Sequence, residues 1–177
     1  MRFNPRILII VIIAISLIFI GIFYLFNSKQ SNQSQTSSTT QNSSEITSEK
    51  FDYKASFAIY TNGTFRIFED PKYHNLSEDV YIGSSNPNIV NIKKANITWD
   101  NFFKTLPMSL RKDCLTTGTI QTFCTNGEFV LQFYINGTRN QSALDQVINL
   151  GDKLLVTFER ENSPVIQSQI SSIPDSN

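Results

Sequence analysis

The sequence predicts an α+β domain that follows one N-terminal transmembrane helix and a polar linker. Three observations support this prediction. Residues 7–26 form an apolar run of twenty residues without a charge. Residues 27–50 are almost entirely polar, and residues 51–177 combine strand-like segments with one aromatic helical segment. Strand and helix periodicities within one stretch of this size are typical of a single domain built from both element types.

The apolar run has the length of a membrane span. As a helix it extends over about 30 Å, the thickness of a bilayer's hydrocarbon layer. Arg2 and Arg6 precede it, and only Lys29 lies close behind it. The positive-inside rule therefore places residues 1–6 in the cytoplasm and the following domain outside the cell, with the lipid bilayer as the partner of residues 7–26.

A cleaved signal peptide is the alternative for this run. Its apolar region normally has about 7–15 residues and ends at a small-residue cleavage site. The run here is longer, and the residues that end and follow it, Tyr24 to Asn27, offer no such site. The sequence therefore favours an uncleaved signal-anchor helix.

The segment after the helix is a linker by composition. Nineteen of the 24 residues at positions 27–50 are Ser, Thr, Gln or Asn, and Ile46 is the single apolar residue. Such a segment cannot bury enough apolar surface to offset its ordering entropy. We expect a disordered stalk between the membrane and the domain at residues 51–160.

The first half of this domain reads as two strand pairs. Residues 53–60 and 64–68 flank Asn62-Gly63, the dipeptide that supplies the two positive φ angles of a type I′ hairpin turn. Residues 80–83 and 89–93 are shorter β-like runs on either side of the turn sequence Ser-Ser-Asn-Pro-Asn.

Residues 98–106, TWDNFFKTL, change to a helical pattern. Thr98 suits an N-cap, and Pro107 ends the helix. An aromatic stripe of this kind could be a binding platform, but it more often packs against a sheet as part of the core. We expect the second role for the four residues of the stripe, which are Trp99, Phe102, Phe103 and Leu106.

Two further strands follow the helix. Residues 129–135, FVLQFYI, alternate between two faces before Asn136-Gly137, and residues 153–158, KLLVTF, follow another turn signal. One helix between two strand pairs packs across one face of a mixed sheet. This order is similar to that of the ubiquitin-like β-grasp.

The tail at residues 161–177 carries a shorter helical signal. Ser163 suits an N-cap before Pro164 at the first helical position. Ile166, Ile170 and Ile173 follow at spacings of four and three. We expect a short amphipathic helix that packs on the domain.

The two cysteines, Cys114 and Cys124, have nine residues between them. A redox pair usually has C-x-x-C spacing, and a closed zinc site needs four ligands, whereas the chain has two Cys and one His. Two cysteines on the oxidising side of a membrane favour a structural disulfide. We therefore expect no metal ligands and no cofactor.

Seven N-x-S/T sequons occur in the chain. Asn-rich turns produce sequons freely, so turn chemistry is one explanation and glycosylation of an exported surface is the other. The candidate N-glycosylation sites are Asn32, Asn42, Asn62, Asn75, Asn96, Asn136 and Asn140.

No catalytic constellation is present in the sequence. The single histidine, His74, lies in a polar stretch and is interpreted as a surface residue, and Glu69-Asp70 and Glu78-Asp79 as solvated carboxylates. Residues 51–177 carry 11 Lys or Arg and 13 Asp or Glu, a net charge of −2, without a basic run. Nucleic acid is therefore excluded as an expected partner.

Several motifs together resemble a family of uncharacterised exported proteins of archaea and small uncultured bacteria. The motifs are TWDNFFKTL at 98–106, the cysteine pair, FYING at 133–137 and GDKLLVTF at 151–158, within residues 55–160. The resemblance implies a membrane helix, a polar stalk and an extracytoplasmic domain. Some members of the family carry an automatic protein-disulfide isomerase label.

The resemblance also bears on metal binding. Family members carry histidines before the helix, in patterns that suggest a metal site. The matching positions here are Tyr81, Asn91 and Lys93, none of which replaces a neutral imidazole ligand. The resemblance therefore implies a shared fold but no metal site in this chain.

These observations leave three functional hypotheses. The first is a non-enzymatic binding or assembly module, displayed outside the cell on a single-pass anchor, whose partner is an envelope protein or a glycan. The alternative is an envelope thiol–disulfide exchange factor that uses Cys114 and Cys124. The third is a membrane-anchored metal-binding protein.

Overall fold

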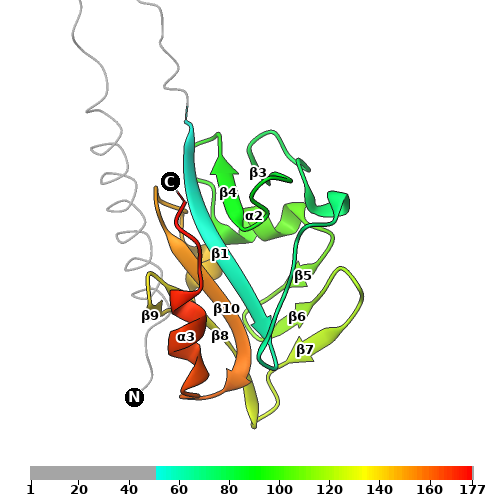
Figure 1. Cartoon of the computed structure of the whole chain (residues 1–177), viewed down its shortest axis with the longest axis vertical. Coiled ribbons are helices and arrows are strands. Elements are labelled where there is room, and N and C mark those ends of the chain that lie inside the picture. Colours follow the sequence, from blue (N-terminus) through cyan, green and yellow to red (C-terminus); the bar gives the residue numbers. More distant parts are fainter. Residues whose placement is uncertain (1–50, 177) are drawn as a thin grey trace, which may run out of the picture. The chain divides into compact units, whose positions relative to one another are not determined.

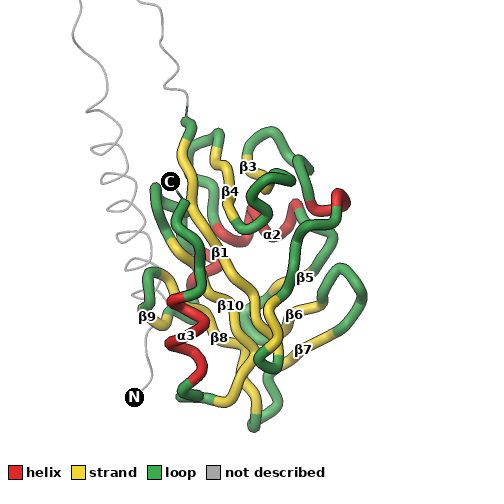
Figure 2. The backbone as a smooth tube through the Cα atoms, in the orientation of Figure 1, coloured by secondary structure: helices red, strands yellow, loops and turns green. Residues whose placement is uncertain are grey.

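The computed structural model describes residues 51–176. The predicted N-terminal segment, membrane helix and linker, together with Asn32 and Asn42, lie outside these residues. Within residues 51–176, no helix is long and apolar enough to span a bilayer. The described residues form two sheets and two α-helices, which confirms the α+β class (Figures 1 and 2).

The elements follow the order expected for a strand-rich chain with one central helix. They are β1 (Tyr53–Thr61), β2 (Thr64–Phe65), η1 (Pro71–Tyr73), β3 (Val80–Ile82), β4 (Ile89–Ile92), α2 (Trp99–Thr105), β5 (Ser109–Leu110), β6 (Cys114–Thr116), β7 (Thr122–Cys124), β8 (Phe129–Ile135), β9 (Thr138–Arg139), η2 (Ala143–Asp145), β10 (Lys153–Arg160) and α3 (Val165–Ser171).

The large sheet has β1 and β10 at its centre. Its strand order is β3-β4-β1-β10-β8-β9, and β2 pairs with the end of β1. β1 and β10 run parallel, from the pair Ser56–Lys153 to the pair Thr61–Phe158, whereas the other pairings are antiparallel. The sheet is therefore mixed, with the first and last long strands side by side.

Helix α2 packs on one face of this sheet, as the aromatic stripe predicts. Thr98 Oγ1 accepts a hydrogen bond from Asn101 N at 3.1 Å, and Asn101 Oδ1 accepts one from Thr98 N at 3.0 Å, which forms a capping box. Trp99, Phe102 and Phe103 are at most 2% exposed. These three side chains fill the core rather than a binding surface.

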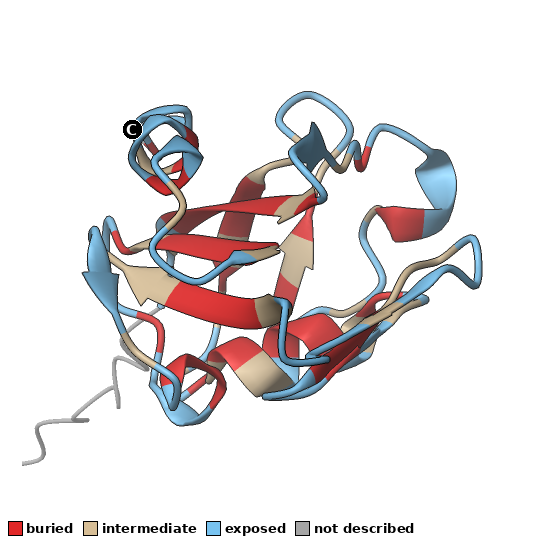
Figure 3. Ribbon diagram, turned by 90° about the horizontal axis from the view of Figure 1, so that it is seen from below, coloured by how far each residue is buried: buried red, intermediate tan, exposed pale blue. Residues whose placement is uncertain are grey.

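Helix α3 packs on the opposite face. Figure 3 shows the buried strands of the sheet between this C-terminal helix and a second layer formed by α2 and the three-stranded sheet. Ile166 and Ile173 pack there with Ala58 and Leu155. The expected cap is wrong in detail: the helix is capped by Pro164 without a side-chain hydrogen bond.

The first hairpin is confirmed at its turn and shorter than expected in its second arm. Asn62 and Gly63 have φ angles of 51° and 72°, as a type I′ turn requires. Only Thr64 and Phe65 pair with β1, because the chain then leaves the sheet and Phe68 enters the core, where it is 4% exposed. The departure of this segment from the sheet forms one wall of a pocket.

Candidate functional site

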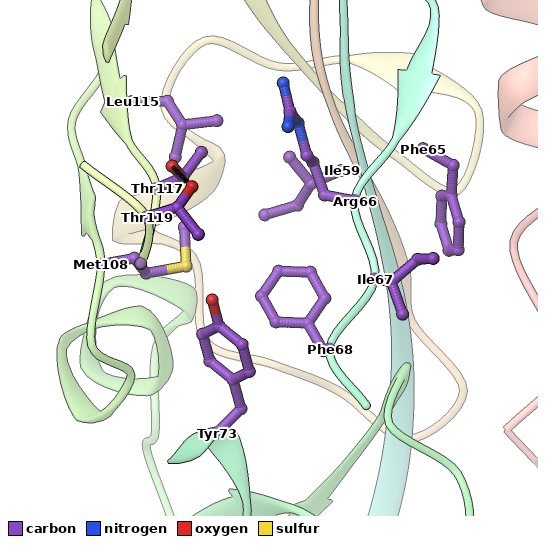
Figure 4. A pocket seen from close by; sticks show the side chains of 11 residues that line it. Ile59, Phe65, Arg66, Ile67, Phe68, Tyr73, Met108, Leu115, Thr117 and Thr119 are labelled. Carbon is purple, nitrogen blue, oxygen red and sulfur yellow. Dashed lines mark hydrogen bonds between the residues drawn. The ribbon is translucent and has the colours of Figure 1, made fainter. Parts of the chain in front are cut away.

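A pocket of about 260 Å³ lies between the segment after β2 and the hairpin β6–β7. Figure 4 shows Arg66 and Phe68 pointing into the pocket from one wall, while Phe65 and Ile67 of the same segment point away from it. Leu115, Thr117, Thr119 and Met108 lie along the other wall, and the Tyr73 ring reaches between the two walls. The lining combines apolar side chains with the polar groups of one arginine, one tyrosine and two threonines. None of the lining residues is a carboxylate, a cysteine or a histidine.

Aromatic packing fixes the first wall. The Phe68 ring lies edge-on to Phe57 of β1 and to Tyr73, with centroid separations of 5.1 Å in both cases. His74 Nε2 donates a hydrogen bond to the carbonyl oxygen of Phe68 at 2.8 Å. His74 is half-buried, so its interpretation as a surface residue is wrong, because the imidazole holds this wall in place.

The short helix η1 places Tyr73 in the pocket. Asp70 caps this turn, since its Oδ1 accepts a hydrogen bond from Lys72 N at 3.0 Å. That backbone hydrogen bond is the main reason why the pKa of Asp70 lies below its ordinary value, and the nearby Lys72 ammonium adds to it. The cap is therefore charged at neutral pH.

The disulfide between Cys114 and Cys124 fixes the second wall. The two residues face each other in β6 and β7 with their Cα atoms 4.1 Å apart. The flanking bond from Thr125 N to Asp113 O, 2.9 Å long, shows that they form a non-hydrogen-bonded pair, the pairing that brings side chains closest. The disulfide thus fixes the register of the hairpin that carries Thr117 and Gly118.

Gly118 lets this hairpin approach Tyr73. A Cβ atom on Gly118 would collide with the Tyr73 hydroxyl oxygen and would lie 2.9 Å from the Pro107 carbonyl oxygen. The φ angle of Gly118 is not in the left-handed region, so the requirement is for space rather than for backbone freedom.

Gly118→Ala should therefore destabilise the protein by about 1–3 kcal/mol through overpacking. Gly83→Ala is the matched control, because no atom lies within 4 Å of its Cβ position and its φ is ordinary. The control should change stability by less than about 0.5 kcal/mol. Urea denaturation of both variants checks this, and equal midpoints would contradict the close approach of the hairpin.

Exposed apolar side chains lie on the two segments that form the pocket walls. Phe65 and Ile67 of the first wall are 38% and 63% exposed, and Ile120 at the hairpin tip is 86% exposed. Ile120 follows Thr119, which lines the pocket, and has a φ of 66°, a strained conformation for a β-branched residue. We call Phe65, Ile67 and Ile120 the apolar rim.

Arg66 carries the one positive charge of the pocket lining. Its Nε donates to Thr61 Oγ1 at 2.5 Å and its Nη1 donates to Gln121 Oε1 at 3.2 Å, so the side chain links β1 to the hairpin. The guanidinium carbon lies 5.0 Å from the centre of the Phe123 ring. Two of its five N–H groups are thus engaged within residues 51–176.

The charge of Arg66 has no carboxylate partner among the described residues. Nine of the eleven Lys and Arg side chains in residues 51–176 form ion pairs, and only Lys54 and Arg66 do not. Arg66 is half-buried, and such a cation is stabilised by an anion more strongly than an exposed one.

After the Arg66 guanidinium, the hydroxyl group of Tyr73 is the second polar group of the pocket lining that can form further hydrogen bonds. Tyr73 is 8% exposed, and its hydroxyl forms no hydrogen bond with the residues that the structure describes. Figure 4 shows the hydroxyl pointing into the pocket at a distance from the Arg66 guanidinium. The pocket therefore offers hydrogen-bond donors at two separate positions.

The described sequons are turn residues, which explains their asparagines without glycans. Asn62, Asn75, Asn96 and Asn136 are exposed and have φ angles of 51°, 54°, 60° and 51°. Asn136 Nδ2 also donates to Asp152 Oδ1 at 2.9 Å. Asn140 is half-buried, and its Oδ1 accepts a hydrogen bond from Ser142 N at 2.9 Å. Asn62, Asn75 and Asn96 are therefore the more accessible candidates of the five.

Of the three positions compared with histidines above, Tyr81 lies on the edge strand β3, Asn91 lies on the neighbouring strand β4, and Lys93 directly follows β4. Tyr81 and Asn91 face each other across β3 and β4, and the Lys93 ammonium lies 2.5 Å from Asp52 Oδ1. That contact raises the pKa of Lys93. In residues 51–176, no three His, Cys, Asp or Glu side chains are grouped as metal ligands would be.

Sequence reasoning missed the pocket. β5, β6 and β7 have only two or three residues each, too few for a periodic pattern. Arg66 lies within the predicted strand at residues 64–68, where no local pattern marks it as a pocket residue. Comparisons with protein-family models, with curated proteins and with solved structures found no match for the chain.

Proposed function

We propose that the chain is a single-pass membrane-anchored surface protein whose domain binds an envelope protein or a glycan outside the cell without catalysing a reaction. The apolar run at residues 7–26, its preceding arginines and the polar segment at 27–50 support the anchor and the topology. The resemblance to membrane-anchored exported proteins supports the same arrangement.

We further propose that the domain is of the β-grasp type. The support is the strand order β4-β1-β10-β8 with the parallel pair β1–β10 in the middle and α2 following the first antiparallel strands. Such sheets carry unrelated functions, so the fold alone does not identify the partner.

The pocket with its unpaired arginine is the observation that carries the binding function. An open apolar pocket with a few polar groups is the usual form of a ligand site, and an exposed apolar rim is typical of an interaction surface. Its lining contains no carboxylate, cysteine or histidine, the side chains used most often as catalytic acids, bases and nucleophiles. The geometry therefore supports binding rather than chemistry.

A protease-protection experiment tests the topology. A tag fused after Asn177 should be digested when protease is added to intact cells, because the domain lies outside the membrane. A tag that is protected in intact cells and digested after lysis would contradict the proposed anchor. An internal control tag on a cytoplasmic protein must remain protected.

An affinity pulldown from solubilised membranes tests the binding surface. We expect the full-length chain to retain a stoichiometric protein or glycan partner, and Ile67→Asp in the apolar rim to reduce its recovery about tenfold, a loss of roughly 1.4 kcal/mol in binding. Leu150→Asp is the matched control, since Leu150 is 76% exposed and does not line the pocket. Equal recovery with both variants, or no partner for the wild type, would contradict the proposal.

A further inference from the structure

We infer that the pocket binds a carboxylic acid with a small apolar body, whose carboxylate contacts the Arg66 guanidinium and whose body packs against Phe68, Tyr73 and Met108. The inference rests on the proposed binding function and deepens it by naming the chemistry of the bound group.

The charge of the ligand follows from Arg66. The guanidinium lies in the pocket lining with three N–H groups that have no acceptor within residues 51–176. Its two hydrogen bonds and the Phe123 ring hold it in place before a ligand arrives. A planar, fixed fork of donors matches a carboxylate, which can accept two hydrogen bonds from it.

The size and polarity of the body follow from the rest of the lining. About 260 Å³ is slightly below the range of roughly 300–1,000 Å³ that is usual for small-molecule sites, so the pocket holds a single ring or a short aliphatic chain. The ring of Phe68, the ring of Tyr73 and the thioether of Met108 supply its apolar surface (Figure 4). A strongly polar ligand such as a sugar would leave these surfaces poorly matched, so the inference selects against the glycan alternative of the proposed function at this pocket.

The Tyr73 hydroxyl adds a second, weaker requirement. It is unpaired within the described residues but is not one of their fully buried unsatisfied atoms, so an acceptor oxygen on the ligand body would take the place of solvent at the hydroxyl. Because it lies apart from Arg66 in Figure 4, it contacts the body of the ligand rather than the carboxylate.

A series of compounds that differ only in the head group tests the charge. Isothermal titration calorimetry of the full-length chain in lipid nanodiscs, with empty nanodiscs titrated in parallel, should show that 3-phenylpropionate binds about 10- to 100-fold more tightly than 3-phenylpropanol. 3-Phenylpropylamine should bind more weakly still. If the alcohol or the amine binds as tightly as the acid, or if no compound binds, the inference is overturned.

A pair of variants tests the role of Arg66 itself. Arg66→Gln should lower the affinity for the acid much more than the affinity for the alcohol, so that the preference for the acid is lost. A purely structural role would instead lower both affinities together. Lys54→Gln is the matched control, since Lys54 is the other cation without an ion pair in residues 51–176 and does not line the pocket. A retained acid preference in Arg66→Gln would overturn the inference.

The same chemistry occurs in free small acids and in the carboxyl-terminal residue of a protein partner. Titration of N-acetyl-Gly-Gly-Phe and of its amide distinguishes these sources, because tighter binding of this peptide than of 3-phenylpropionate assigns the carboxyl terminus, and weaker binding assigns a free acid. The pulldown with Ile67→Asp is independent of this series. If the pocket bound a neutral or cationic ligand, the inference of a carboxylate ligand would be wrong, but the proposed binding function would not be contradicted.

Discussion

Phe57→Ala is expected to lower the free energy of unfolding by about 3–5 kcal/mol, the largest loss among the substitutions considered. Phe57 is fully buried in β1. Its ring lies 5.1 Å from Phe68, 5.3 Å from Phe102 and 5.8 Å from Phe103, measured between centroids. Its removal leaves a cavity that joins the sheet, α2 and the first wall of the pocket.

Urea denaturation measures this loss through Trp99, the single tryptophan of the chain, which is fully buried. Phe57→Leu should be much less damaging, at most about 1.5–2 kcal/mol, because most of the volume remains. Leu150→Ala, at a side chain that is 76% exposed, should stay within about 0.5 kcal/mol of the wild type. A similar small effect for Phe57→Ala would show that the aromatic cluster is not the core of this domain.

Loss of the disulfide has the second largest expected effect. Cys114 and Cys124 are ten positions apart, and the chain-entropy relation for a loop of this length gives about 2.7 kcal/mol. The double variant Cys114→Ser, Cys124→Ser should lose about this amount. Because the bond fixes the register of the wall that carries Gly118, ligand affinity in the pocket should fall as well.

Denaturation of the wild type with and without reductant measures the same quantity. Reductant should lower the midpoint of the wild type and leave that of the double variant unchanged, which controls for effects of the reagent. If the double variant is as stable as the wild type, the disulfide is not a structural staple. A disulfide-exchange activity that vanishes in the double variant would then favour the alternative function.

Local sequence signals were sufficient for most of the secondary structure. Asn62-Gly63 specifies its turn because both residues tolerate positive φ, and the structure gives them φ angles of 51° and 72°. Thr98 begins α2 with a capping box, and the alternation of residues 129–135 became β8. These features depend on neighbours within a few positions, so they can be predicted from the sequence without knowledge of the fold.

Features that depend on contacts between residues far apart in the sequence could not be predicted from it. The second hairpin arm ends at Phe65 because the Phe68 ring packs against Phe57 and Tyr73 in the core. His74 looked exposed, yet its imidazole holds the Phe68 carbonyl. The expected cap at Ser163 is also wrong: Pro164 stands at the cap position of α3, and no side-chain hydrogen bond caps the helix.

The sequence by itself determined the α+β class, the turns and the aromatic face of α2, because each is encoded by periodicity or by backbone preferences over a short stretch. The tertiary structure alone decided that Arg66 would be half-buried without a carboxylate partner among the described residues, in the same pocket as the Tyr73 hydroxyl and the hairpin around Gly118. These three residues come from segments that no local pattern connects. Only the packing of β1, η1 and the disulfide-bonded hairpin brings them to one pocket.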